Sequence, residues 1–162
     1  MDMPETPVPS PPHWNHSHLG HWLRLALQRF DARVMELMAY HPGVPLGLAN
    51  LAARGQVGAA HIHITRHLCE QGLRLTDLAQ RAGMSKQAMG TLVDQCEAWG
   101  MVTREPDPLD ARARKVRFTA SGMAWLGAYQ DAAAQAQAEV QAAVGPEVAA
   151  VIAIGLEIYS GQ

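Results

Sequence analysis

The sequence predicts a mainly helical fold with one small β-hairpin, and three observations predict it. First, two stretches with the three- and four-residue apolar spacing of helices flank Gly83, a residue suited to a tight turn. Second, two short runs of strand-forming residues flank a turn-rich segment, Pro106 to Arg112. Third, long stretches rich in helix-forming residues lie near both ends of the chain.

Length and composition narrow the class of protein. A chain of 162 residues is long enough for one domain with a sizeable core or for one subunit of an intertwined dimer. Its two cysteines are far too few for a disulfide scaffold. No apolar run reaches the roughly 18 residues that span a bilayer, and the N-terminus lacks the basic-then-apolar pattern of a secretion signal. We therefore expect a cytoplasmic protein with no membrane partner.

Charge is segregated along the chain, although the formal net charge is only -2. Between Arg74 and Arg117 there are eight basic and six acidic residues, whereas residues 118–162 contain four acidic residues and no Lys or Arg. A basic region joined to an acidic one is typical of a DNA-binding protein with a separate assembly region. The alternative is chance segregation.

The N-terminal part predicts a tail followed by two helices. Residues 1–18 hold five prolines and little that can pack, so we expect a disordered tail. A broad apolar face predicts a helix from Leu19 to about Ala39. Within residues 43–57, Pro45 favours the start of a short helix that ends around Gly55.

The middle of the chain predicts a pair of short helices. A helix from Ala59 to Gln71 is expected to end at Gly72. Leu73 to Leu75 suit a strand of one or two residues, and a second helix follows over Leu75 to Ala82, with Thr76 as its N-cap.

The helix after the Gly83 turn has a clear start and one apolar side. Ser85 is a good N-cap, because its hydroxyl can accept an unpaired amide of the first turn. The apolar residues form one stripe that we expect to be buried: Ala88, Met89, Leu92, Val93 and Cys96. Two short helices joined by a Gly-containing turn make a helix-turn-helix, whose second helix can enter a DNA major groove.

After Gly100 the pattern changes to that of strands. Met101 to Glu105 and Ala113 to Phe118 both suit strands, and Pro106 to Arg112 forms the tip between them. A β-hairpin in this place is the wing of a winged helix-turn-helix.

The C-terminal part predicts two more helices. Thr119 is expected to cap a long, Ala-rich helix that reaches about Val144, where Gly145 and Pro146 break it. The final helix, ending near Tyr159, is apolar on most sides. Such a helix must be covered, most simply by another subunit.

Several motifs in sequence resemble the MarR (multiple antibiotic resistance regulator) family. The run Leu75 to Met89, and Leu92-Val93-Asp94 with Trp99 to Val102, resemble its helix-turn-helix. Asp107 to Val116 resembles its Asp-x-Arg wing, and Phe118 to Gly122 its Leu-Thr-x-x-Gly helix start. The resemblance covers about residues 68–125 well, and the flanking helices in order and length. The chain departs from the pattern at residues 43–57, where the family usually has a shorter link.

The resemblance implies a homodimeric transcription regulator. Residues 19–58 would supply an N-terminal dimerisation helix and connecting segment, residues 59–118 the winged helix-turn-helix, and residues 119–162 the C-terminal dimerisation helices. Such proteins bind double-stranded DNA at pseudo-palindromic operators, usually as repressors. Many release the DNA when a small phenolic or other aromatic ligand binds between the two regions.

The predicted DNA contacts lie on the second helix of the pair and on the wing. Gln87 can hydrogen-bond adenine with two bonds, and Lys86 can reach phosphates. Arg112 suits a narrow, negative minor groove, and Asp110 lies on the same side of the strand, where it can orient the guanidinium. The alternatives are a solvated helix face and an ordinary exposed Asp–Arg pair. The full set of predicted DNA-binding residues is Thr76, Ser85, Lys86, Gln87, Gly90, Thr91, Asp110, Arg112 and Arg114.

An effector pocket is predicted less sharply, from residues on helices that can wall a cavity: Trp22, His61, His63, Arg66 and Trp125. The alternative is ordinary core or surface residues. His63 and His67 share a helix face at a spacing that can chelate zinc, but no second ligand cluster completes a site, so we predict no metal and no cofactor. Cys69 and Cys96 lie on stripes that look buried, which favours a structural role.

An enzyme has little support, because the chain has neither a Gly-rich phosphate loop nor a nucleophile set beside a base. The alternative function is a winged-helix module that binds protein and has lost sequence-specific DNA binding. Lys86, Gln87, Asp110 and Arg112 argue against it, whereas an absence of retention on heparin or operator DNA would favour it.

Overall fold

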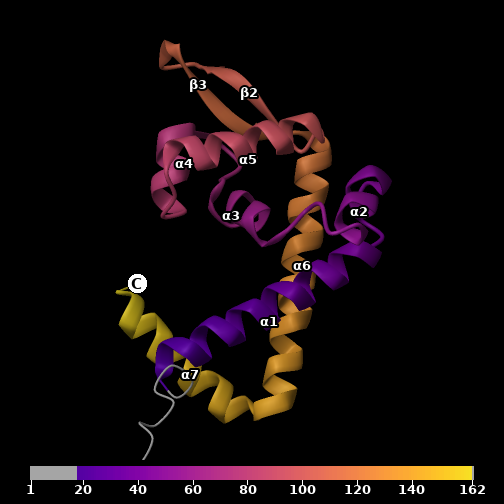
Figure 1. The fold of residues 1–162 in the computed structure, drawn as a ribbon, viewed down its shortest axis with the longest axis vertical. Coiled ribbons are helices and arrows are strands. Elements are labelled where there is room, and N and C mark those ends of the chain that lie inside the picture. The colour runs from indigo at the N-terminus through magenta and orange to yellow at the C-terminus, as the bar shows by residue number, and fades with distance from the viewer. Residues whose placement is uncertain (1–17, 162) are drawn as a thin grey trace, which may run out of the picture.

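The computed structural model describes residues 18–161 and shows a bent, mainly helical molecule with a small sheet at one end (Figure 1). The elements follow in the order α1 (Leu19–Tyr40), α2 (Leu46–Ala53), α3 (Ala59–His67), β1 (Leu73–Arg74), α4 (Leu75–Arg81), α5 (Lys86–Ala98), β2 (Val102–Asp107), β3 (Asp110–Phe118), α6 (Ala120–Val144) and α7 (Pro146–Ser160). The predicted fold class is confirmed.

One half of the molecule, here called the winged lobe, consists of α3, α4, α5 and the three strands. The strands form an antiparallel sheet in the order β1-β3-β2, in which Leu73 pairs with Val116 and Val102 with Phe118. Met89 of α5 is buried in the same core as Val102 and Val116. The apolar stripe therefore fixes which side of α5 faces outward.

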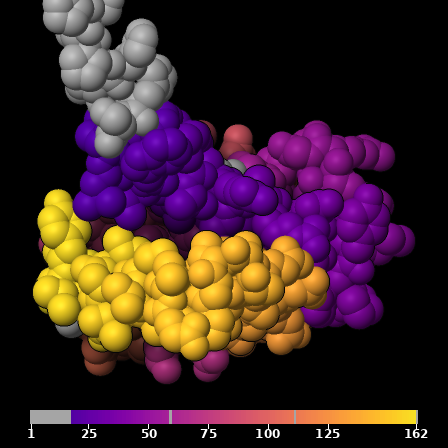
Figure 2. Space-filling view, turned by 90° about the horizontal axis from the view of Figure 1, so that it is seen from below, coloured from indigo at the N-terminus to yellow at the C-terminus, as the bar shows by residue number. Residues whose placement is uncertain are grey.

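The other half, here called the helical arm, consists of α1, α2, α6 and α7. Helix α6 runs from the sheet to the far end of the molecule, α1 crosses it, and α7 turns away from its end at 118° (Figure 1). Val34 and Met38 of α1 and Ala132 and Ala136 of α6 are buried in the core. Figure 2 shows that α1, α6 and α7 make up the face opposite the hairpin.

Two of the predicted N-caps, Ser85 and Thr119, and the predicted turn at Gly83 are present. The N–H of Ala88 donates to Ser85 Oγ at 3.1 Å, and the N–H of Gly122 donates to Thr119 Oγ1 at 3.0 Å. Gly83 has φ +63°, the left-handed conformation that this turn requires. The predicted strand at β1 and the short helix at α2 are confirmed as well.

Three local predictions are wrong. Helix α3 ends at His67 and not at Gln71, because Leu68 is extended and the chain turns through Cys69 to Gly72 to bring β1 onto the sheet. Thr76 lies inside α4, whose N-cap is Arg74. Ala88 is exposed, so the buried stripe of α5 begins at Met89.

The strands of the hairpin are longer than predicted. They extend to Asp107 and from Asp110, so the tip consists of Pro108 and Leu109 alone. Asp107, the last residue of β2, is held in place by hydrogen bonds from Arg74 and from the Leu109 N–H.

The predicted tail of residues 1–18 lies outside the described residues, apart from His18. Within residues 18–161, no single helix is long and apolar enough to cross a membrane; α6 and α7 reach that length and hydropathy only together, across their sharp bend.

Candidate nucleic-acid interface

Helix α5 presents a polar surface at its N-terminal end. Lys86, Gln87 and Thr91 are exposed, since the buried residues occupy the opposite side of the helix. The Ser85 hydroxyl serves as the N-cap, and the Thr91 hydroxyl donates to the Gln87 carbonyl at 3.3 Å. The long side chains of Lys86 and Gln87 are therefore the ones best placed to reach beyond the helix.

Gly90 lies on this helix beside the polar surface. A Cβ added at this residue would meet Leu75 Cδ2 at 3.7 Å, which is an ordinary van der Waals contact. Packing inside the chain therefore does not require glycine here. Because glycine costs about 1 kcal/mol relative to alanine inside a helix, a close approach by an external partner gives a reason for its presence.

Acidic residues of the winged lobe neutralise some of its cations and leave others available. Arg104 of β2 binds Asp94 and Glu97 of α5, and the Nε of Arg117 lies 3.7 Å from a Glu105 oxygen. By contrast, the side chains of four basic residues make no ion pair with any residue of the described part of the chain: Arg81, Lys86, Arg112 and Arg114. Three of these four belong to the predicted DNA-binding set.

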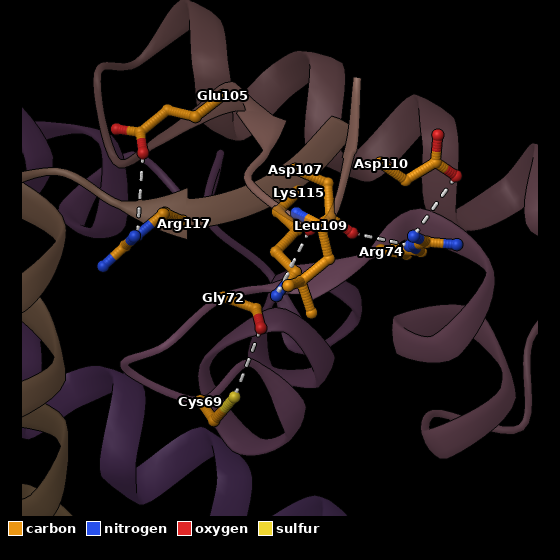
Figure 3. Close-up of polar contacts among 9 residues, drawn as sticks. All are labelled: Cys69, Gly72, Arg74, Glu105, Asp107, Leu109, Asp110, Lys115 and Arg117. Atoms are coloured by element: carbon orange, nitrogen blue, oxygen red, sulfur yellow. Dashed lines mark hydrogen bonds and ion pairs between the residues drawn. The ribbon is translucent and has the colours of Figure 1, made fainter. Parts of the chain in front are cut away.

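The base of the wing tip is built around a buried carboxylate that the sequence analysis missed. Asp107 is 3% exposed; its Oδ2 accepts a hydrogen bond from Arg74 Nε at 2.8 Å, and its Oδ1 accepts one from the Leu109 N–H at 3.0 Å (Figure 3). Lys115 Nζ lies 3.8 Å from the same Oδ1. The bond from the Leu109 amide, followed by that from Arg74, lowers the pKa of Asp107, so the carboxylate is ionised at neutral pH.

The predicted role of Asp110 is wrong in its detail. Its Oδ1 accepts from the backbone N–H of Arg112 at 3.1 Å, and its Oδ2 lies 3.4 Å from Arg74 Nη2. The carboxylate therefore pairs with the Arg74 guanidinium, and within the described residues it forms no ion pair with the Arg112 guanidinium. The Asp-Pro turn signal at Asp107 and Pro108 could have pointed to this cluster, but no local pattern marks Arg74 as its partner.

The five predicted effector residues do not gather in one place. Trp125 is 1% exposed and its Nε1 donates to Thr65 Oγ1 at 3.1 Å, so it is a core residue. His61 contacts Gln95 through Nε2 at 2.8 Å and packs on Trp99. Trp22 is 56% exposed near the start of α1.

Arg66 is the member of that set that joins the two halves of the molecule. From α3 it donates to Tyr129 Oη of α6 at 2.9 Å, and it forms an ion pair with Asp31 of α1. The Trp125–Thr65 bond lies beside it, because Thr65 directly precedes Arg66 on α3 and Trp125 is one turn before Tyr129 on α6. The winged lobe is thus fastened to the helical arm through α3.

His63 and His67 stack on α3, with ring centroids 6.1 Å apart, and the buried Nδ1 of His63 has no hydrogen-bond partner among the described residues. Burial, together with His63, Arg66 and Arg81, lowers the pKa of His67. The charges of Arg66 and Arg81 disfavour a metal cation beside His67, and residues 18–161 contain no group of three or more potential metal ligands.

The two cysteines differ in surroundings. Burial raises the pKa of the Cys96 thiol to about 12, so it stays protonated and unreactive at neutral pH. Cys69 is only half-buried, against expectation, and its thiol contacts the Gly72 carbonyl oxygen at 3.5 Å.

Two surface cavities lie along α1. One, of about 380 Å³, is mainly apolar and lies between α1 and α3, where its walls include Arg24, Asp31 and Ile62. The other, of about 310 Å³, lies between the C-terminal half of α1 and α6. None of the five predicted effector residues lines either cavity, although Arg66 borders the first through its contact with Asp31.

Residues 56–113 match the family model described as "MarR family". The chain carries a MarR-family winged helix-turn-helix. The match spans α3, the helix-turn-helix and most of the wing, which is the region where the sequence motifs lie. Because MarR-family regulators are DNA-binding proteins and not enzymes, the family also confirms the expectation that the chain is not an enzyme.

Solved structures of MarR-type regulators share the whole fold at low sequence identity. BpsR of Bordetella bronchiseptica, whose DNA binding is regulated by 6-hydroxynicotinic acid, matches with a TM-score of 0.66 and 21% identity over 94% of this chain and 99% of BpsR. The transcriptional repressor CouR bound to a 23-mer DNA duplex matches with a TM-score of 0.64 and 16% identity over 94% of this chain and 99% of CouR.

A second CouR structure, from Rhodococcus jostii RHA1 with p-coumaroyl-CoA bound, has a TM-score of 0.64 and 17% identity over 87% of this chain and 90% of CouR. No curated protein sequence matches the chain significantly. At these identities the likeness concerns the fold alone. Over the winged lobe it agrees with the match to the family model, and it also includes the helical arm.

Proposed function

We propose that the protein is a sequence-specific DNA-binding transcriptional repressor that acts as a homodimer on a pseudo-palindromic operator. One observation carries the proposal. The acidic residues of the winged lobe bind Arg74, Arg104, Lys115 and Arg117 and leave the cations of the α5 N-terminus and the wing available. DNA binding needs cations for phosphates and directional groups for base edges, and both occur here.

The homodimer is proposed from the apolar surface of the helical arm. Helix α7 has no buried residue, and its exposed apolar side chains are Val148, Val151, Ile152, Ile154, Leu156, Ile158 and Tyr159. Leu19, Trp22, Leu25 and Leu27 of α1 are exposed as well. Apolar surface exposed on two helices of the arm marks an interface with another chain, and a second copy carries the same surface, as a two-fold interface requires.

The proposed effector is a small aromatic or phenolic molecule, bound in the cavity between α1 and α3. That cavity is mainly apolar and has Asp31 in its wall. A ligand there would compete with the Asp31–Arg66 ion pair that fastens α3 to the arm. Loss of this ion pair would change the position of each winged lobe relative to the helical arm. In the dimer, the two lobes would then no longer match the spacing of the operator half-sites, which favours release of the DNA.

A substitution in α5 tests sequence-specific reading. We expect Gln87→Ala to lower affinity about tenfold for a duplex that the wild-type protein selects from genomic DNA, because one paired contact to a base is lost. Affinity for a random duplex should change less than about twofold. Gel-shift titration on both duplexes measures the difference.

Gln80→Ala, in an exposed glutamine of α4, is the matched control and should keep the wild-type preference. Equal losses on both duplexes for Gln87→Ala would remove Gln87 from base reading.

A further inference from the structure

Leu109 at the tip of the wing is 88% exposed, more than any other large apolar side chain in the part of the chain that the structure describes. The tip lies at the opposite end of the molecule from α7 and the start of α1, where most of the other exposed large apolar side chains are found (Figure 1). The proposed dimer interface therefore does not account for it. Its exposed neighbour Pro108 makes the whole tip apolar.

The position of Leu109 is fixed by the chain. Its backbone N–H donates to Asp107, and the same carboxylate is held by Arg74 of β1 and approached by Lys115 of β3 (Figure 3). The contacts come from the tip and from two different strands. The backbone that carries Leu109 is thereby held in place, so a partner that covers the leucine does not have to order the loop.

The surroundings of the tip are cationic. Arg112 and Arg114 follow on β3, both exposed and both without an ion pair among the described residues. Phosphates border a DNA groove on both sides, and proteins that bind the minor groove combine cationic side chains with apolar ones inserted at base steps. Leucine and proline are both among the side chains used in this way.

We propose that Leu109 enters the minor groove and packs against deoxyribose and base edges, with Asp107 as the residue that positions it. The inference rests on the proposed DNA-binding function and adds an apolar contact to it. An apolar contact contributes affinity without releasing counterions, so its loss leaves the salt dependence of binding unchanged.

The experiment compares Leu109→Ala with wild type on the selected duplex, at several salt concentrations and by hydroxyl-radical footprinting. We expect affinity to fall about tenfold, with an unchanged slope of log affinity against log salt. Protection of the minor-groove sugars under the wing should be lost, while protection over the major groove persists. Leu46→Ala, in an exposed leucine of α2, should match wild type, and Arg112→Ala should give a shallower slope.

Wild-type affinity and an unchanged footprint for Leu109→Ala would overturn this inference but not the proposed function. A changed salt slope would also overturn it, because Leu109 would then act through the neighbouring cations. A wild-type protein that selects no duplex overturns the proposed function itself.

For the positioning role, Asp107→Ala should weaken binding, and adding Leu109→Ala to it should cost little more affinity. Fully additive losses would separate Asp107 from Leu109.

Discussion

Replacing Ile154 with glutamate should convert the proposed dimer into monomers and lower operator affinity at least about 100-fold, or about 2.8 kcal/mol. Ile154 lies in the middle of the exposed apolar surface of α7. A charge buried in an apolar interface carries a large desolvation cost, whereas the same charge on a free monomer stays in water. A monomer then binds a single half-site and loses the contribution of the second winged lobe.

Analytical ultracentrifugation and titration of the selected duplex measure both effects. Leu46→Glu places the same charge on an exposed leucine of α2 and should leave mass and affinity unchanged. Should Ile154→Glu remain dimeric with wild-type affinity, α7 is not the interface.

Replacing Gly122 with alanine should destabilise the junction between wing and arm by about 3 kcal/mol. A Cβ at this position would overlap the carbonyl oxygen of Met101 and lie 2.9 Å from Phe118 Cδ1. The Met101 carbonyl is backbone just before β2, and Phe118 is the last residue of β3. The strands and α6 must therefore move apart to make room for the added Cβ.

Gly127→Ala is the matched control, because it lies on the same helix and its added Cβ meets nothing within 4 Å. There the substitution should stabilise the helix by up to about 1 kcal/mol. Thermal unfolding distinguishes the two: Gly122→Ala should lower Tm by about 10 °C. A Tm for Gly122→Ala equal to that of the control would contradict the packing described at this junction.

Structural features that depend only on residues close together in the chain, such as helix caps and turns, could be predicted from the sequence. Ser85 and Thr119 each precede a helix and satisfy its first turn with their own hydroxyl groups, so a few residues decide the outcome. Gly83 is likewise a local requirement of backbone conformation. The order of helices and strands followed from such signals and from apolar spacing, and the family match confirms the resulting winged helix-turn-helix.

Features that depend on distant contacts could not be predicted. Arg74 and Asp107 are 33 residues apart, and only the pairing of β1 with β3 brings them together at the wing. Arg66 meets Asp31 and Tyr129 across 35 and 63 residues. Trp22 and Trp125 both lie on apolar helix faces, and only the packing of α6 shows that one is exposed and the other is core.

The most direct test of the account is the composition and footprint of the complex between the full chain and the duplex it selects. We predict two chains per duplex by sedimentation, with two protected major-groove segments whose centres lie about 10 base pairs apart. One chain per duplex, or coating of any DNA without a defined footprint, would contradict the account.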